Sequence, residues 1–238
     1  MPESRSQRRA RVASYIPLRV TATLRCGVIS DGWLPFDAIL YYAQHAATLI
    51  APRVATVPRA RTVQEDADAA TAGTLPLKRL AGDTPHWYHA ASCAVWPSHV
   101  ADGIDYWSKR LDQSQVDLLA PAATRAKIPI SGGPYRGYRM PVHYRHALSL
   151  TWYCVGDPAR IVPLLRLVRG LGKKTAHGWG RVIAWDVQAS PEDWSVTGPD
   201  GRLMRPIPSE DPAAPIYGLR PPYWLPRHQQ PCRLPERA

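Results

Sequence analysis

Residues 16–28 have the sequence IPLRVTATLRCGV, in which apolar and polar side chains alternate. The apolar set comprises Leu18, Val20, Ala22, Leu24, Cys26 and Val28. The opposite set carries Arg19 and Arg25, with two threonines between them. A period of two that includes β-branched residues predicts a half-buried β-strand. The polar face of this strand, with its two arginines, is therefore expected to meet solvent or a ligand.

The pattern becomes helical soon after this strand. Apolar residues recur at three- and four-residue steps, which predicts an amphipathic helix containing Phe36, Ile39, Leu40, Ala43, Ala47 and Ile50. Pro35 suits the first helical turn, and Asp37 suits the positive end of the helix dipole. Pro52 is expected to end the helix.

Three more strands and one more helix are predicted. The strands are expected at residues 86–97, 146–155 and 181–187, the last with Ile183, Trp185 and Val187 on one face. The helix is expected to begin with Asp157 as its N-cap and Pro158 as its first residue. The resulting order is strand, helix, strand, hairpin excursion, strand, helix, strand. This order predicts the α+β fold called ferredoxin-like (RRM-like), with the plan β-α-β-β-α-β.

The predicted ferredoxin-like domain covers residues 15–188, after a flexible basic arm at residues 1–14. Within the domain, residues 51–85 are interpreted as an insertion and residues 126–145 as a projecting thumb hairpin. Residues 189–238 are rich in proline and show no clear periodicity. They are predicted to form an extended C-terminal arm, which packs over the core or docks on a partner.

The composition favours a polyanionic partner. Lys and Arg number 30 against 19 Asp and Glu, a formal net charge of +11, which favours nucleic acid over an acidic membrane surface. The four cysteines are far apart and form no CxxC pair, so buried free thiols are expected rather than a zinc site. Neither a signal peptide nor an apolar run of about 18 residues occurs, so the sequence predicts a cytoplasmic protein with no membrane partner. No cofactor is predicted.

A glycine-rich basic loop joins the predicted second helix to the last strand, and residues 170–181 have the sequence GLGKKTAHGWGR. Glycines allow close approach of the backbone, and the interleaved cations favour a sugar-phosphate chain. The motif is not a Walker loop, because GxxxxGK[ST] is missing and the loop follows a helix. The predicted RNA-binding residues are Gly170, Gly172, Lys173, Lys174, His177, Gly178, Trp179, Gly180 and Arg181, with Arg19 and Arg25 of the first strand. A flexible turn with exposed lysines is the alternative interpretation.

The predicted thumb is a second stretch of basic and aromatic residues. Its tyrosines could stack on bases, which contributes about 1–3 kcal/mol per base, and its cations could contact phosphates. The predicted thumb residues are Lys127, Tyr135, Arg136, Tyr138, Arg139, His143 and Arg145. A solvated surface hairpin is the alternative. No paired acid and base can be assigned, so no catalytic residue is predicted.

Three motifs resemble the RAMP superfamily of CRISPR proteins. The helix start LPFDAIL at residues 34–40 is similar to the first helix of that superfamily, and the loop ending in Arg181 is similar to its glycine-rich loop. The stretch GPYRGYRMP at residues 133–141 is similar to the thumb of its small single-domain members. The run RPPYW at residues 220–224 resembles the tail of the Cas-five-like subunit of type IV effector complexes.

The resemblance implies a non-catalytic subunit that holds the 5′ handle of the guide RNA (crRNA) with the loop. Such a subunit caps a filament of backbone RAMP subunits, with a large subunit and target DNA as further partners. The thumb would wedge against a neighbouring subunit and the RNA. Two alternatives stay open. One is a guide-RNA processing endonuclease of the same superfamily that uses His177, His143 or an arginine cluster. The other is an RNA-binding protein of the ribosome or of tRNA without a CRISPR partner.

Overall fold

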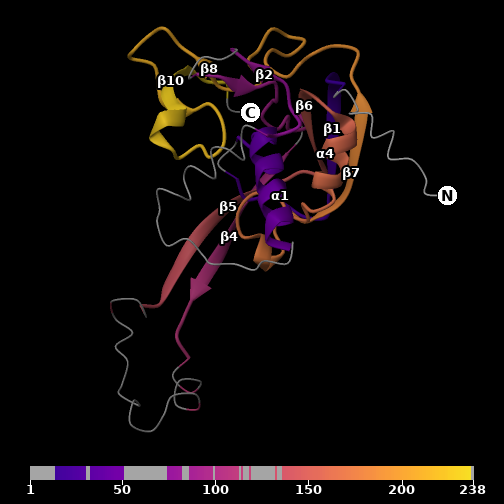
Figure 1. Cartoon of the computed structure of the whole chain (residues 1–238). Helices are drawn as coiled ribbons and strands as arrows, with labels where there is room; N and C mark the ends of the chain where they lie inside the picture. The colour runs from indigo at the N-terminus through magenta and orange to yellow at the C-terminus, as the bar shows by residue number, and fades with distance from the viewer. Residues whose placement is uncertain are drawn as a thin grey trace, which may run out of the picture.

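The computed structural model describes residues 14–30, 33–50, 74–81, 86–98, 100–112, 114, 118, 132 and 136–236. Over these residues the chain is α+β, with mostly antiparallel strands (Figure 1). In chain order the elements are β1 (Ile16–Leu24), α1 (Phe36–Ile50), β2 (Arg79–Leu80), β3 (Tyr88–His89), β4 (Ala101–Lys109), β5 (Tyr138–His146), β6 (Ser149–Gly156), α4 (Pro158–Leu165), η3 (Thr175–His177), β7 (Val182–Ala189), β8 (Ile207–Pro208), β9 (Ile216–Gly218), η4 (Pro226–His228) and β10 (Gln229–Arg233).

The central sheet has the strand order β6-β1-β7, and both pairings are antiparallel. Val20 in the middle of β1 lies opposite Trp152 of β6 and Val187 of β7. The alternation that predicted β1 is confirmed, because Leu18 and Val20 are buried while Arg19 is exposed. One face of the sheet thus forms the core, and the other carries polar side chains.

A further extended segment runs along the outer edge of β6. Val95 donates a backbone hydrogen bond to Thr151 O (2.7 Å), and Val155 donates one to Ala90 O (2.9 Å). The opposite side of the segment is held by other parts of the chain, since Cys93 N donates to Met204 O (2.7 Å). The strand predicted at residues 86–97 therefore occurs only as β3 and isolated bridges, because its backbone changes partners along its length.

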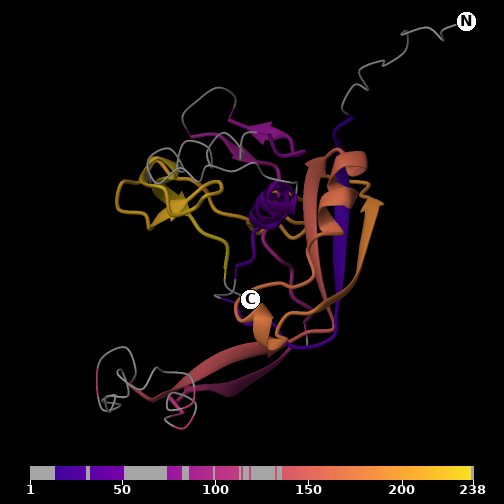
Figure 2. The same ribbon diagram turned by 60° about the horizontal axis from the view of Figure 1, so that its bottom comes forward.

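Helices α1 and α4 pack against the apolar face of the sheet and against each other (Figure 2). Phe36 of α1 lies near Trp152, with ring centroids 6.1 Å apart. The predicted start of α4 is confirmed: the Asp157 side chain accepts a hydrogen bond from Ala159 N at 2.9 Å. No helix in the described part of the chain is long and apolar enough to cross a membrane.

Strand β7 differs from its prediction at one residue. The β1–β7 register shifts between Thr23 and Leu24, so that Thr23 faces Ala184 and Leu24 faces Val182. The shift leaves Ile183 63% exposed, whereas Trp185 packs against the core. Placing Ile183 with the core-facing residues was wrong, because an irregularity of one residue reverses the direction of the side chains beyond it.

Strands β4 and β5 form a long antiparallel hairpin that projects away from the rest of the chain (Figure 1). Trp107 lies opposite Met140, and Gly103 lies opposite Tyr144. Only β5 falls in the segment predicted as the thumb, and its partner β4 lies well before that segment. Lys127 and Tyr135 lie outside the described residues.

Residues 203–236, here called the C-terminal unit, contain a small sheet with the order β8-β10-β9. Helix α1 lies between the central sheet and this unit (Figure 2). The predicted extended arm was therefore wrong for these residues. Their strands are two to five residues long, too short to show a period in the sequence.

The end of the predicted insertion belongs to the core. Leu75 and Leu77 are buried, and Lys78 N donates to Val155 O (2.8 Å). Strand β2 then pairs with β3. The rest of the insertion, at residues 51–73 and 82–85, lies outside the described residues, as do residues 1–13 of the predicted arm.

Candidate nucleic-acid interface

The glycine-rich loop is held against the segment after β1 by its own backbone. Lys173 N donates to Ile29 O (2.7 Å), and Gly180 N donates to Gly27 O (2.8 Å). Gly180 has a φ of +64°, and a Cβ there would collide with the Leu171 carbonyl oxygen. The glycine at this position is therefore required for close packing within the protein.

This packing limits one part of the sequence hypothesis, in which the loop backbone closely approaches a sugar-phosphate chain. Six of these amides donate to the protein itself: those of Leu171, Lys173, His177, Gly178, Gly180 and Arg181. An amide that donates inside the protein has no hydrogen left for a phosphate oxygen. The exposed side chains of Lys173, His177 and Arg181 are the groups that the loop presents to a ligand.

Two stretches that the sequence analysis treated separately meet in space. Lys174 Nζ lies 3.3 Å from the centre of the Trp107 ring of β4, a cation–π contact. His177 lies near the same indole, with ring centroids 6.3 Å apart, and Trp179 packs on Tyr144 of β5 at 4.7 Å. The loop and the face of the hairpin that carries Trp107 and Tyr144 thus form one surface of cations and aromatic rings. The sequence analysis did not single out Trp107.

The hairpin divides the predicted thumb residues between its two faces. Tyr138 contacts Trp107, with ring centroids 5.1 Å apart, so it lies on the face that meets the loop. Because neighbouring residues of a strand point to opposite faces, the odd-numbered Arg139, His143 and Arg145 lie on the other face. Arg136 lies before β5 and is exposed.

Contacts within the hairpin already engage two of these arginines. The Arg139 guanidinium lies 4.0 Å from the centre of the Tyr106 ring. Arg145 Nε lies 3.2 Å from Asp102 Oδ1, and its guanidinium is 4.6 Å from the Trp96 ring centre. The described thumb residues therefore do not all converge on one site with the glycine loop, and Tyr138 is the one placed on the face that meets it.

An open hollow of about 820 Å³ adjoins the loop. Its lining includes two arginines, two aromatic residues and one hydroxyl group: Tyr42, Arg169, Thr175, Trp179 and Arg181. Both arginines are exposed, and Tyr42 of α1 is 60% exposed. A hollow of several hundred Å³ has room for a nucleotide. The sequence offered one signal for this part of the site, because Tyr42 falls outside the apolar stripe predicted for the first helix.

The two predicted arginines of β1 lie apart. Arg25 follows the strand and adjoins the loop, because its amide donates to Arg181 O (2.9 Å). Arg19 is six residues earlier, about 20 Å away at the rise of a strand, and it donates to Gln188 Oε1 (2.7 Å). Only Arg25 joins the surface around the loop.

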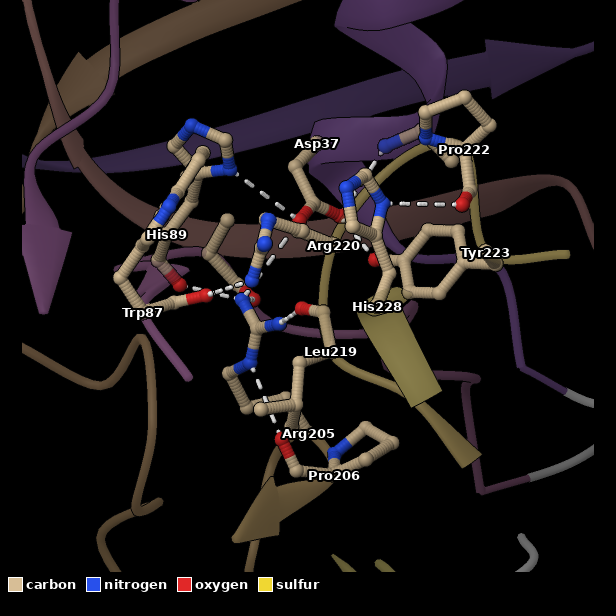
Figure 3. Close-up of polar contacts among 12 residues, drawn as sticks. Asp37, Trp87, His89, Arg205, Pro206, Leu219, Arg220, Pro222, Tyr223 and His228 are labelled. Carbon is tan, nitrogen blue, oxygen red and sulfur yellow. Dashed lines mark hydrogen bonds and ion pairs between the residues drawn. The ribbon is translucent and has the colours of Figure 1, made fainter. Parts of the chain in front are cut away.

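A buried polar cluster connects α1 to the C-terminal unit (Figure 3). Tyr223 donates its hydroxyl hydrogen to Asp37 Oδ1 at 2.5 Å. Asp37 Oδ2 lies 3.5 Å from His89 Nδ1 and 3.8 Å from Arg205 NH1. Arg205 is 1% exposed and also donates to the carbonyl oxygens of Ala91 and Leu219 (2.9 and 2.6 Å).

The chemistry of this cluster is structural. Burial by itself would raise the pKa of Asp37, but the charge of Arg205, the neighbouring His89 and the hydrogen bond from Tyr223 hold it below its usual value. Burial and the Asp37 charge raise the pKa of Tyr223 well above its usual value. Asp37 and His89 are fully buried, so a substrate cannot reach them. Asp37 lies in the first turn of α1, as predicted from the helix dipole, and it also fastens the start of α1 to the C-terminal unit.

Three of the four cysteines are buried free thiols as predicted, and Cys26 is the exception. All four are free, and Cys93, Cys154 and Cys232 are buried. Burial raises the pKa of the Cys93 thiol to about 12. Cys26 is partly exposed, and its thiol donates to Gly178 O at 2.9 Å, which fastens the loop.

The fold and the site together define an α+β protein with one surface of cations and aromatic rings, built from two distant stretches of its sequence. Residues 16–235 match the sequence model of a family described as CRISPR type IV associated protein Csf3. The chain belongs to this family. A search of curated proteins found no match.

Membership of this family confirms the type IV CRISPR part of the prediction and does not fit the ribosomal or tRNA-associated alternative. The place in the RAMP superfamily and the contact with the guide-RNA handle stay predictions.

Proposed function

We propose that this chain is the non-catalytic subunit of a type IV CRISPR ribonucleoprotein that binds the 5′ handle of the guide RNA. The single observation that carries the proposal is the contact between the glycine-rich loop and the hairpin. There, Lys174, Trp107 and Trp179 belong to one continuous surface. Such a mixture of cations and rings suits single-stranded RNA, whose phosphates need positive charge and whose bases stack on aromatic faces.

The strand arrangement supports a ferredoxin-like, RAMP-type domain. The order β7-β1-β6 is extended at the β6 edge by residues 90–95, which are bonded antiparallel to it. The β-α-β-β-α-β plan places its strands in this order, with both helices on one face.

Within the interface, the hollow beside the loop is the proposed place for one nucleotide of the handle. Arg169 and Arg181 supply positive charge for phosphate, and Trp179 and Tyr42 supply rings for stacking. Lys173 and His177 extend the positive and polar surface along the loop. The RNA then follows the loop towards the hairpin face that carries Trp107 and Tyr144.

The opposite face of the hairpin is proposed to meet a neighbouring backbone subunit and the RNA, as a thumb would. Arg139, His143 and Arg145 lie on that face. A subunit that binds the handle in this way would cap one end of the backbone filament. A large subunit and target DNA are further proposed partners.

The RNA-binding proposal is tested by the salt dependence of affinity. The double variant Arg169→Ala/Arg181→Ala is compared with the wild type by fluorescence anisotropy, using a repeat-derived single-stranded RNA at several salt concentrations. Each lost phosphate contact makes the negative slope of log K against log salt shallower by about 0.7. The slope of the double variant is therefore expected to be shallower than that of the wild type by about 1.4.

The matched control is Arg202→Ala, because Arg202 is an exposed arginine of the segment before the C-terminal unit that pairs with Asp200 at 3.2 Å. It should leave the slope unchanged. An unchanged slope in the double variant would remove the hollow from the RNA site.

The remaining alternative is a guide-RNA processing endonuclease. Its proposed bases are His177 and His143, and in the described part of the chain the recorded contact of His177 is the Trp107 ring rather than an acid. Incubation of the purified chain with a repeat-containing RNA in the absence of metal tests this alternative. A defined cut that is lost in His177→Ala or His143→Ala would replace the non-catalytic proposal.

A further inference from the structure

Strand β7 is an edge strand with an open outer side. Among the described residues its partner strand is β1, and only its first residue also bonds on the outer side, where Val182 N donates to Arg169 O at 3.1 Å. The opposite edge of the sheet, at β6, is covered by residues 90–95. An edge strand that stays open is normally protected by lysine, proline or a bulge. β7 contains no lysine, arginine or proline, and its register shift lies at its first residues.

The hydrogen-bond pattern identifies the backbone groups that face outward. Ser190 N donates to Pro17 O at 2.9 Å, so the amide at this position points towards β1. Because amides alternate in direction along an antiparallel strand, those of Trp185, Val187 and Ala189 point away from β1. These amides and the carbonyl oxygens of the same residues form a template for one more strand.

A groove of about 470 Å³ runs beside this edge, between α4 and β7. Its lining is apolar except for two arginines: Val162, Leu165, Arg166, Val168, Arg169, Val182, Ile183, Ala184, Trp185 and Val187. Ile183 is 63% exposed. Arg166 lies at the C-terminal end of α4 and is exposed. The described lining contains no acidic residue.

We propose that the outer edge of β7 binds an extended segment of a partner protein, which adds to the central sheet as a fourth strand. Alternate side chains of that segment would enter the groove, so they are apolar. Acidic residues of the segment would lie near Arg166, the arginine of this lining that does not also line the hollow proposed for RNA. The inference rests on the proposed assembly into a ribonucleoprotein, but not on the RNA contacts of the loop.

The same observations disfavour the other occupants. RNA has no backbone that can continue the hydrogen-bond ladder of a β-sheet, and it gains nothing from apolar walls. A second copy of this chain would bring two grooves lined by arginine together, in a protein of net charge +11. An extended segment of another protein can pair with the outward backbone groups of β7. Its apolar side chains can fill the groove, and its acidic side chains can pair with arginine.

Hydrogen–deuterium exchange, resolved to single amides, tests the proposal. Three samples are compared: the free chain, the chain with repeat-derived RNA, and the intact complex isolated from its own cells. The outward amides of Trp185, Val187 and Ala189 are expected to exchange at least tenfold more slowly in the intact complex than in the other two samples. Unchanged exchange in the complex would overturn the proposal.

Two further outcomes would also overturn it. Equal protection by RNA alone would assign this edge to nucleic acid, and protection of the free chain that grows with its concentration would assign it to a second copy. RNA binding by the loop could fail while the edge is still protected, so the two proposals fail separately.

A matched pair of variants tests the strand itself. Ala189→Pro removes one outward amide and breaks no hydrogen bond to β1, whereas Ala189→Val keeps the amide. The proline variant is expected to lose the slowed exchange at Trp185 and Val187 in the complex and to keep wild-type RNA affinity. The valine variant should behave as the wild type in both measurements. Full protection in the proline variant would contradict strand addition.

Discussion

The variant Tyr223→Phe removes one hydroxyl group from the buried polar cluster and leaves the ring in place. In the wild type that hydroxyl donates to Asp37 Oδ1 at 2.5 Å. A hydrogen bond to a buried charged group contributes about 1.5–3 kcal/mol. The Ala38 amide, which lies 3.0 Å from the same oxygen, still donates to it in the variant. We therefore expect the free energy of unfolding to fall by about 2 kcal/mol.

Urea denaturation followed by tryptophan fluorescence measures this loss. Tyr42→Phe is the matched control, because it removes a tyrosine hydroxyl from an exposed position of the adjoining helix; it should change the free energy of unfolding by less than about 0.5 kcal/mol. A loss below about 0.5 kcal/mol in Tyr223→Phe would refute the assignment of Asp37 and Tyr223 as the fastening between α1 and the C-terminal unit.

The same pair sets a pH dependence. The pKa of Asp37 in the folded protein lies below its ordinary value of 3.8. The stability that comes from its ionised form is therefore present above pH 3.8 and is lost as the pH falls through the folded pKa. The difference between the wild type and Tyr223→Phe should be largest above about pH 4 and should shrink in stronger acid.

Two other perturbations have defined outcomes. Trp107→Ala removes the ring under Lys174, so the free energy of RNA binding in an anisotropy assay should weaken by about 1–3 kcal/mol. The free energy of unfolding should change by about 1 kcal/mol or less. Trp224→Ala, at a 64% exposed position of the C-terminal unit, is its control and should not alter RNA affinity. Burial and Arg220 lower the pKa of His228 to about 4. As the pH falls from 6.5 to 4, the His228 imidazole is therefore protonated in the unfolded chain before it is protonated in the folded protein. The melting temperature should fall over this range, and it should fall less steeply in His228→Asn.

The parts of the fold that were predictable are those with one buried face. In β1, Leu18 and Val20 enter the core while Arg19 stays exposed, and the sequence period records this burial directly. The start of α4 was predictable because the Asp157 cap is a local interaction.

Strand β4 was not predictable in the same way, because it projects from the protein. Ile104 and Tyr106 are about half exposed, so burial imposes no alternation on the strand. Only the two separate halves of the proposed RNA surface were predictable. The loop and the thumb could each be recognised in the sequence as basic aromatic stretches. The contact between Lys174 and Trp107 could not, because it depends on the path of the whole hairpin.

The buried cluster shows a second kind of limit. Asp37 and Tyr223 are 186 residues apart in the sequence, and each has an ordinary local explanation. Asp37 fits a helix start, and the prolines before Tyr223 fit an extended arm. Their pairing follows only from the docking of the C-terminal unit on α1, which no local pattern encodes.

The proposed RNA surface is tested most directly by crosslinking in the intact complex. Guide RNA that carries 4-thiouridine in its 5′ handle is irradiated in the complex, and the crosslinked peptides are identified by mass spectrometry. We predict crosslinks at residues 169–181 and at Trp107 or Tyr138. Crosslinks confined to the C-terminal unit, with none in the loop or on the hairpin face that meets it, would contradict the account.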